Sequence, residues 1–285
     1  MPLITILMAA YQAEATILAA VNSVRGQAHG NWELIIASDC GTDYLSLCRA
    51  NGIEDGRIHM VPTPAIGAGP SAARNAALAA AQGNYLSILD SDDRWQSEKL
   101  SALLPLAQKT GLACDNTGAM HPDGHTIATA YPIAAAPREI DAVTMMNTGV
   151  PHFPLFRRNL AGSGYHGDLR FAEDVVFNME LIARAGAMTL LPQPLTHYIQ
   201  RPDSATNATS SWQRAEAAYG QILAKLDHGQ ITVPAGQKDA IKRAFTEKRR
   251  LNSAYGAAVV AGTATTFQSF LATQRLPAGQ RRDMP

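Results

Sequence analysis

The stretch Tyr85-Leu-Ser-Ile-Leu-Asp90-Ser-Asp-Asp93 joins a short apolar run directly to three carboxylates. Residues 85–89 have the length and composition of a buried strand. Three carboxylates so close together repel one another unless a positive charge lies among them. Divalent cations such as Mg²⁺ prefer oxygen ligands and often share substrate phosphates. The stretch therefore predicts a strand that ends at a metal and phosphate site. The alternative is a solvated acidic turn before a helix that begins near Ser97.

This strand is the fourth in a regular alternation of strands and helices. We expect strands at 3–8, 32–37, 57–61 and 85–89, and helices at 15–24, 44–50 and 70–82. The alternation predicts an α/β fold whose open sheet is mostly parallel in its first part. Ligands of such sheets bind beyond the carboxyl ends of the strands, where Tyr11, Asp39 and Asp90 fall.

Beyond residue 96 the alternation loosens. We expect a helix at 98–109, a strand at 111–117, a hairpin turn at 121–124, a helix at 173–185, short strands at 188–191 and 195–199, and mainly helix from residue 212 onward. Residues 130–170 are rich in Pro, Gly and Ala and are expected to form an irregular lid.

Composition excludes several classes of protein. The 285 residues are 46% hydrophobic and 17% charged, a globular balance, and their formal net charge is zero. Nucleic-acid binding needs a basic excess, so we expect no nucleic-acid partner. No apolar stretch reaches the roughly 18 residues of a membrane span. No basic segment precedes the first apolar run, so we expect no signal peptide. The three scattered cysteines suit a reducing cytoplasm.

The neutral total conceals two zones of opposite charge. Residues 1–200 carry 12 Lys/Arg against 18 Asp/Glu, whereas residues 201–285 carry 12 against 6. The basic excess includes a cluster on one predicted helix, made of Lys238, Lys242, Arg243, Lys248, Arg249 and Arg250. One interpretation of the cluster is a peripheral contact with anionic lipid or with a lipid-linked diphosphate, and the simpler explanations are preferred. The alternatives are a solvated helix packed beside the acidic zone and an oligomer contact.

The run Gly67-Ala-Gly69-Pro-Ser-Ala72 matches a dinucleotide-binding fingerprint superficially. In that motif the first glycine follows directly from a strand, whereas Pro62 and Pro64 intervene here. NAD binding is therefore the weaker interpretation. Arg74, in the helix that follows, is placed near a phosphate or carboxylate; a surface or ion-pair arginine is the alternative.

The combination of motifs resembles family 2 glycosyltransferases with the GT-A fold. The matching segments are Ile4–Tyr11, Asp39–Asp43, Ser71–Asn75, Tyr85–Asp93, Phe171–Asp174 and His197–Thr206. The resemblance implies a catalytic domain over residues 1–205, with a nucleotide-binding half at 1–110 and an acceptor-side half at 111–205. A mainly helical, basic extension then follows over 206–285.

The resemblance also implies roles for the matched residues. Ala10 and Tyr11 would line the nucleotide base, and Asp39 would bind that base, which in this family is usually uracil. Arg74 would lie near the nucleotide. On the same basis Asp90 would contact ribose, Asp92 would hold Mn²⁺ or Mg²⁺ on the diphosphate, and Asp93 would orient the donor sugar or the loop.

On the acceptor side, the resemblance implies that Asp174 is the catalytic base, with Glu173 in support. Taken alone, the pair is better explained as two acids that favour the dipole of a helix start, worth about 0.3–1 kcal/mol; the acidic cluster at 90–93 reverses that preference. His197 is a candidate third ligand of the metal or phosphate, against a packed histidine. Trp95 is a candidate for stacking on a sugar, against core packing.

Two departures from the family pattern affect these assignments. Ser38 stands where a first aspartate is usual, and Cys40 stands where Ser or Gly is usual. These differences weaken the assignment of uracil as the nucleotide base that is bound. Ile199 stands where an arginine is usual after Tyr198, so the basic role there is expected to pass to Arg201.

These inferences predict a metal-dependent, inverting glycosyltransferase. It would move a sugar from a nucleotide-diphosphate donor, expected to be UDP-linked, to a hydroxyl group in the synthesis of surface polysaccharide or lipid-linked glycan. We expect it in the cytoplasm or at the inner face of the membrane. One alternative is a sugar-phosphate nucleotidyltransferase, although the first strand lacks the Gly-rich basic loop of that class. The other is a non-catalytic subunit of the same fold that binds a partner.

Overall fold

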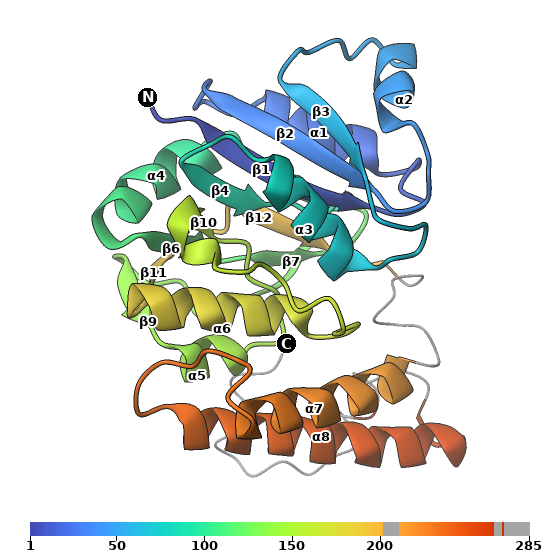
Figure 1. Ribbon diagram of the computed structural model, residues 1–285, viewed down its shortest axis with the longest axis vertical. Helices are drawn as coiled ribbons and strands as arrows, with labels where there is room; N and C mark the ends of the chain where they lie inside the picture. Colours follow the sequence, from blue (N-terminus) through green and yellow to red (C-terminus); the bar gives the residue numbers. More distant parts are fainter. Residues whose placement is uncertain (202–210, 265–269, 271–285) are drawn as a thin grey trace.

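The computed structural model describes residues 1–201, 211–264 and 270. Its central sheet has eight strands in the order β3-β2-β1-β4-β10-β6-β11-β9 (Figure 1). The strands are β1 (Ile4–Ala10), β2 (Trp32–Ser38), β3 (Ile58–Pro62), β4 (Tyr85–Ile88), β6 (Leu112–Asp115), β9 (Arg138–Ile140), β10 (Leu155–Arg157) and β11 (Met188–Leu191).

The first half of this sheet is the predicted parallel α/β unit. Strands β3, β2, β1 and β4 are all parallel, and Ile4 of β1 lies opposite Trp32 and Tyr85. The connecting helices are α1 (Ile17–Arg25), α2 (Tyr44–Ala50) and α3 (Pro70–Ala80). Because the strands share one direction, their carboxyl ends meet at one edge, as the sequence predicts. The predicted α/β class is confirmed, and the complete sheet is mixed because β10 and β9 run antiparallel to their neighbours.

The second half is more ordered than predicted. The region 130–170 contains β9, helix α5 (Ala142–Met146), β10 and the 3₁₀ turn η1 (Arg158–Ala161). Strand β10 lies antiparallel between β4 and β6, with Phe156 opposite Leu86 and Leu112. Elements of three to five residues are too short for periodicity to reveal. Pairing with strands distant in sequence stabilises them instead.

A smaller sheet of four strands covers the end of the central sheet. Its order is β5-β12-β7-β8, and its strands are β5 (Arg94–Trp95), β7 (Gly118–Met120), β8 (Thr126–Thr129) and β12 (Thr196–Ile199). The predicted turn at 121–124 is confirmed, because β7 and β8 pair antiparallel across it. The predicted strand at 111–117 is divided between the two sheets as β6 and β7.

A buried ion pair holds the junction of the two sheets. Lys99 begins helix α4 (Lys99–Thr110), and its Nζ lies 2.6 Å from Oδ1 of Asp115, at the end of β6. Both side chains are completely buried. Oδ2 of Asp115 accepts from the amides of Leu195 and Thr196, so the charge is fully hydrogen-bonded where β12 begins.

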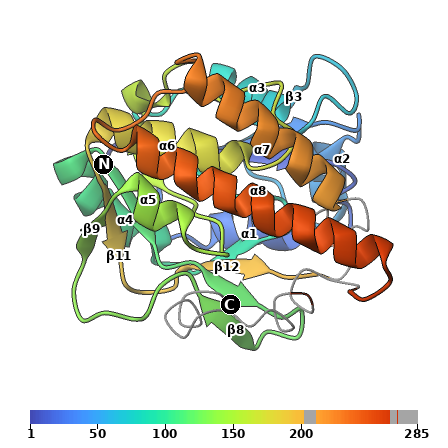
Figure 2. The same ribbon diagram turned by 90° about the horizontal axis from the view of Figure 1, so that it is seen from below.

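Two long antiparallel helices, α7 (Ser211–Asp227) and α8 (Lys238–Val260), pack beside α5 and α6 (Glu173–Ala185) (Figures 1 and 2). Ile222 and Phe245 share one buried cluster with Phe177 of α6, so the helix pair has no separate core there. The predicted domain boundary at residue 205 lies outside the described residues, as does the segment up to Thr206. No described helix has the length and apolar character needed to cross a membrane.

Gly83, before β4, offers a test of the packing at the amino-terminal edge of the sheet. A Cβ atom there would lie 2.7 Å from the amide nitrogen of Thr5 and 2.8 Å from the carbonyl oxygen of Leu3. We expect Gly83→Ala to lower the free energy of unfolding by about 1–3 kcal/mol, because backbone atoms of β1 must shift. Urea unfolding measures this. Gly56→Ala, with no atom within 4 Å of the added carbon, is the matched control; an equal effect in both variants would contradict the prediction.

Candidate active site

The centre of the site is the buried guanidinium of Arg74, on α3. Its Nη2 donates to Oδ1 of Asp90 at 2.8 Å, and its Nη1 donates to Oε1 of Glu173 at 2.9 Å. Arg74 is 6% exposed. One side chain therefore ties the acidic cluster after β4 to the start of α6. The geometry is that of an ion-pair arginine, the alternative considered for Arg74, and its predicted position near the nucleotide stays a prediction.

Electrostatics make this bridge costly to break. Burial opposes the charge on Arg74, but the carboxylates of Asp90 and Glu173 keep its pKa well above the usual value. Removing one member of a buried ion pair leaves the other without compensation, which typically costs about 3–5 kcal/mol.

Asp174 follows Glu173 in the first turn of α6. The preceding residue, Ala172, has a left-handed backbone with φ of 57°. Non-glycine residues adopt this conformation at a cost, and such residues are concentrated at functional sites. Removal from water, followed by the charge of Glu173, raises the pKa of Asp174 to about 6, while Arg74 acts in the opposite direction. A carboxylate of this kind is poised to accept a proton near neutral pH.

The rest of the acidic cluster contacts the end of β12. Oδ2 of Asp92 accepts from Nη2 of Arg201 at 2.7 Å. Asp93 is 1% exposed, and its Oδ1 accepts from the amide of Ile199. Its Oδ2 is buried without a hydrogen-bond partner among the described residues. Burial and the neighbouring Asp90 raise the pKa of both Asp92 and Asp93. An additional cation would relieve this repulsion, so the charge of the cluster favours a divalent metal ion, and metal binding here stays a prediction.

His197 and Trp95 lie away from the main pocket. Nε2 of His197 is 2.9 Å from Nε2 of Gln96. The ring of Trp95 is 5% exposed and lies under Nζ of Lys99 at 4.9 Å. Neither lines the pocket around Asp174, so their predicted roles in metal binding and sugar stacking stay predictions.

A different group of side chains has the spacing of metal ligands. His121, Asp123 and His125, on the exposed turn between β7 and β8, are the one such group found in the described part of the chain. Their ligand atoms all lie within 4.8 Å of one another. Asp123 already pairs with both imidazoles, at 3.0 and 2.6 Å.

The glycine-containing loop after β3 wraps around Asp39. The carboxylate oxygens of Asp39 accept from the amides of Ala68 at 2.9 Å and Gly69 at 2.8 Å. These amides therefore bind a carboxylate of the protein, unlike a phosphate-binding dinucleotide loop. At the adjacent end of β1, Ala10 is buried while Tyr11 is 55% exposed, so its ring is available to a planar base.

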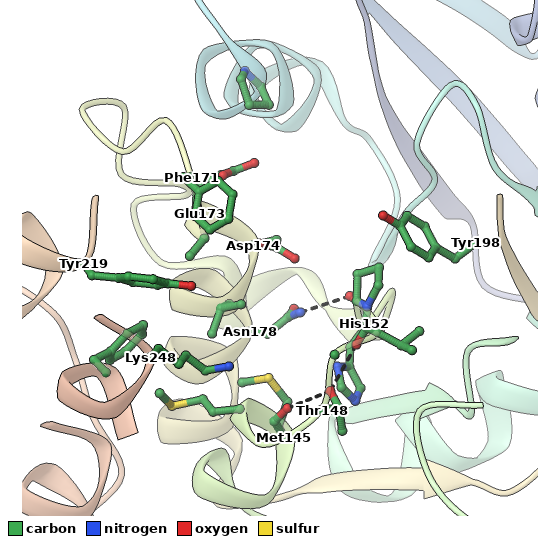
Figure 3. A pocket seen from close by; sticks show the side chains of 18 of the residues that line it. Met145, Thr148, His152, Phe171, Glu173, Asp174, Asn178, Tyr198, Tyr219 and Lys248 are labelled. Atoms are coloured by element: carbon green, nitrogen blue, oxygen red, sulfur yellow. Dashed lines mark hydrogen bonds between the residues drawn. The ribbon is translucent and has the colours of Figure 1, made fainter. Parts of the chain in front are cut away.

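A pocket of about 350 Å³ opens beside Asp174 (Figure 3). Arg74, Asp90, Glu173 and Tyr198 line it from the predicted site. The buried His152 is held by the hydroxyl of Tyr131 at 2.9 Å, and burial lowers its pKa to about 4, so its ring is neutral at pH 7.

Several residues that line the pocket were not predicted as site residues, among them three from α6, α7 and α8. Asn178 lies one turn beyond Asp174 on α6, Tyr219 comes from α7 and Lys248 comes from α8 (Figure 3). Lys248 was assigned to the surface basic cluster. Its spacing from the buried Ile241 and Phe245 places it on the inner stripe of the helix, which was the overlooked indication.

The outward basic cluster is correspondingly smaller than predicted. Lys242 pairs with Asp227, Arg249 with Glu216 and Arg250 with Glu247. Lys238 and Arg243 remain exposed. Contact of this surface with lipid stays a prediction.

The open α/β sheet carries an acidic cluster after its fourth strand, and this cluster faces a helix that begins with a candidate base. This is the arrangement of a GT-A glycosyltransferase. Residues 5–159 match the family model of glycosyl transferase family 2, and the chain belongs to this family. A structure of S. aureus TarS 1-349 in complex with UDP-GlcNAc superposes with a TM-score of 0.67 over 86% of this chain and 72% of that one, at 18% identity. This likeness confirms the fold.

Curated relatives match part of the chain. The chain is 35% identical over 111 residues to the Escherichia coli UDP-Glc:alpha-D-GlcNAc-diphosphoundecaprenol beta-1,3-glucosyltransferase WfgD, covering 39% of this chain and 43% of the relative. It is 31% identical over 128 residues to the succinoglycan biosynthesis protein ExoO of Rhizobium meliloti, covering 44% and 36%. The matches thus span less than half the length of each of these relatives.

The bridge at Arg74 is testable by unfolding. Arg74→Met should lower the free energy of unfolding by about 3–5 kcal/mol at pH 7, because Asp90 and Glu173 lose their common cation. Arg250→Met, which breaks an exposed pair with Glu247, should cost less than about 1 kcal/mol. Chemical denaturation of the two variants gives the comparison. Equal losses of unfolding free energy in the two variants would show that the buried bridge stabilises the fold no more than an exposed ion pair does.

The raised pKa of Asp174 predicts a pH-dependent gain in stability for Asp174→Asn. Above about pH 6 the aspartate is charged in both states, and the folded state carries the cost of that charge. Near pH 4 and below, this cost disappears. The difference between a pKa of about 6 and the usual value of an aspartate corresponds to at most about 3 kcal/mol. The melting temperature of Asp174→Asn should therefore exceed that of the wild type at pH 7.5, and the difference should shrink at pH 4; a constant difference would contradict the pKa assignment.

Proposed function

We propose that this glycosyltransferase moves a sugar from a UDP-linked donor to a saccharide hydroxyl with inversion at the anomeric carbon. The observation that carries the proposal is the bridge from Asp90 through Arg74 to Glu173. It holds a candidate base, Asp174, beside the pocket and within the same network as the acidic cluster of the donor side.

In the proposed reaction Asp174 takes the proton of the acceptor hydroxyl as that oxygen attacks the anomeric carbon. The new carbon–oxygen bond forms on one face of the sugar. The bond to the diphosphate breaks on the opposite face, and its electron pair leaves with UDP. Glu173 and Arg74 fix the start of α6 and hence the position of the base. A pKa of about 6 leaves Asp174 mostly ionised at pH 7, yet basic enough to accept a proton.

A divalent metal ion fits the donor side. Asp92, with Asp90 and Asp93 beside it, would hold the ion. When bound, the ion would neutralise charge on the leaving diphosphate. Arg201, which pairs with Asp92, supplies a second positive charge at the same place. Tyr11 and Asp39 would form the base-binding side, with Ala10 shaping the end of β1.

The names of similar proteins support the choice of donor and acceptor. WfgD is described as using UDP-Glc and a diphosphoundecaprenol-linked sugar, and a TarS structure contains UDP-GlcNAc. We therefore extend the proposal to a lipid-linked or polysaccharide acceptor in surface glycan synthesis. Such an acceptor would bring the protein to the inner face of the membrane, through Lys238 and Arg243 of α8.

Metal-dependent nucleotide binding is the first test. UDP at 100 times its dissociation constant should stabilise the protein by about 2.7 kcal/mol, seen as a rise in melting temperature with Mn²⁺ that EDTA removes. Asp92→Ala should lose the metal-dependent part of this rise. Asp123→Ala, which disrupts the exposed histidine cluster, is the control and should keep it. If Asp123→Ala loses the shift and Asp92→Ala retains it, the metal assignment is wrong.

The role of Asp174 is tested by transfer itself. Asp174→Asn should bind UDP as the wild type does, yet lose at least about a hundredfold in turnover, the lower range for a general base. The wild-type kcat should fall below about pH 6, as the base becomes protonated. Near-normal turnover of Asp174→Asn would remove it as the base. UDP binding without transfer in the wild type, across a panel of UDP-sugars and acceptors, would favour the non-catalytic alternative.

A further inference from the structure

Lys248 brings a positive charge from the carboxyl-terminal helix pair into the pocket of the catalytic domain. In Figure 3 its side chain extends from α8 towards α6, between Tyr219 and Met145. The residue is half-buried. Within the described ranges its ammonium group has no hydrogen bond and no ion pair, unlike Lys242, Arg249 and Arg250 on the same helix.

Asn178 supplies a second polar group to the same pocket that lacks a partner. The residue is 2% exposed and its Nδ2 donates to the carbonyl oxygen of His152 at 3.0 Å. Its Oδ1 is buried without a hydrogen-bond partner among the described residues. Buried polar atoms are nearly always satisfied, so an unpaired acceptor beside an unpaired cation indicates a polar ligand.

We propose that Lys248 and Asn178 form an acceptor subsite next to Asp174, which selects a saccharide carrying a negatively charged group. This inference rests on the proposed function and specifies its acceptor. Lys248 would pair with the anion, a carboxylate or a phosphate, and Oδ1 of Asn178 would accept from a sugar hydroxyl. Neutral acceptors would leave the half-buried ammonium group uncompensated.

The location favours the acceptor over the donor diphosphate as the source of the anion. Asp92 and Arg201, the groups assigned to the diphosphate, do not line this pocket, whereas Lys248 and Arg214 do. Lys248 lies on the side of α5, α7 and α8, beyond the base (Figure 3). The Asp90–Arg74–Glu173 bridge marks the donor side of this pocket, whereas Lys248 and Arg214 line it from the carboxyl-terminal helix pair.

A purely electrostatic role for Lys248 is the competing explanation. Burial lowers the pKa of Lys248, and the negative charge of Asp174 acts in the opposite direction. A lysine that served only to keep Asp174 ionised would affect all acceptors alike and would shift the pH profile of kcat. A lysine that binds an acceptor anion affects acidic acceptors selectively, through affinity.

The test compares two glycosides that differ in one group. p-Nitrophenyl glucuronide carries a carboxylate where p-nitrophenyl glucoside carries a hydroxymethyl group. Their affinities for the wild type are measured by titration calorimetry, with and without UDP and Mn²⁺, because the arm without nucleotide does not depend on donor binding. A third titration with p-nitrophenyl glucoside 6-phosphate distinguishes phosphate from carboxylate.

The wild type should bind at least one of the two acidic glycosides about tenfold more tightly than the neutral one, as expected for a charge-assisted hydrogen bond. Lys248→Met should reduce that preference to less than about twofold, and Lys248→Arg should retain it. Lys109→Met, the same change at an exposed position of α4, should leave the preference intact.

Two results would overturn the subsite. One is a wild type that binds no acidic glycoside more tightly than the neutral one. The other is an equal loss for acidic and neutral glycosides in Lys248→Met, which would give Lys248 a structural or purely electrostatic role. Failure of the proposed function is distinguishable, because it would appear as the absence of UDP binding in the melting experiment, whatever the glycosides do.

Discussion

The buried guanidinium of Arg74 is the constraint on which the site depends. A cation removed from water must be paired, and here two carboxylates from distant parts of the chain, Asp90 and Glu173, share it. The pairing fixes the end of β4 relative to the start of α6. It thereby sets where Asp174 stands with respect to the acidic cluster. Without a common cation, the acids at these two places would repel one another rather than assemble into one site.

The second half of the molecule depends on a similar device. Lys99 and Asp115, both fully buried, join α4 to the end of β6, and Asp115 also receives the amides that begin β12. Strand β12 then carries Tyr198 towards the pocket and leads to Arg201 beside Asp92. The helix pair α7 and α8 completes the opposite wall of the pocket. The site is therefore built from the whole described chain rather than from its amino-terminal half alone.

Much of the fold was predictable where elements are long and apolar. Strands β1 to β4 and helices α1 to α3 follow local patterns that need no tertiary information. Strand β10 does not, because its three residues form a strand only between β4 and β6. The prediction of one strand across 111–117 was wrong for a related reason. The buried charge of Asp115 ends β6 at the junction between the two sheets, and the chain continues into the smaller sheet as β7.

The sequence by itself determined the α/β class, the family resemblance and the positions of the acidic cluster and of Glu173-Asp174, because these are local patterns of charge and periodicity. Only the tertiary structure decided which charges meet. It pairs Arg74 with two acids and encloses Trp95 beneath Lys99. It also turns Lys248 into the pocket, although the sequence places this lysine in a basic cluster on the surface. The physical reason is that burial and pairing depend on segments up to about a hundred residues apart, whose approach no local pattern encodes.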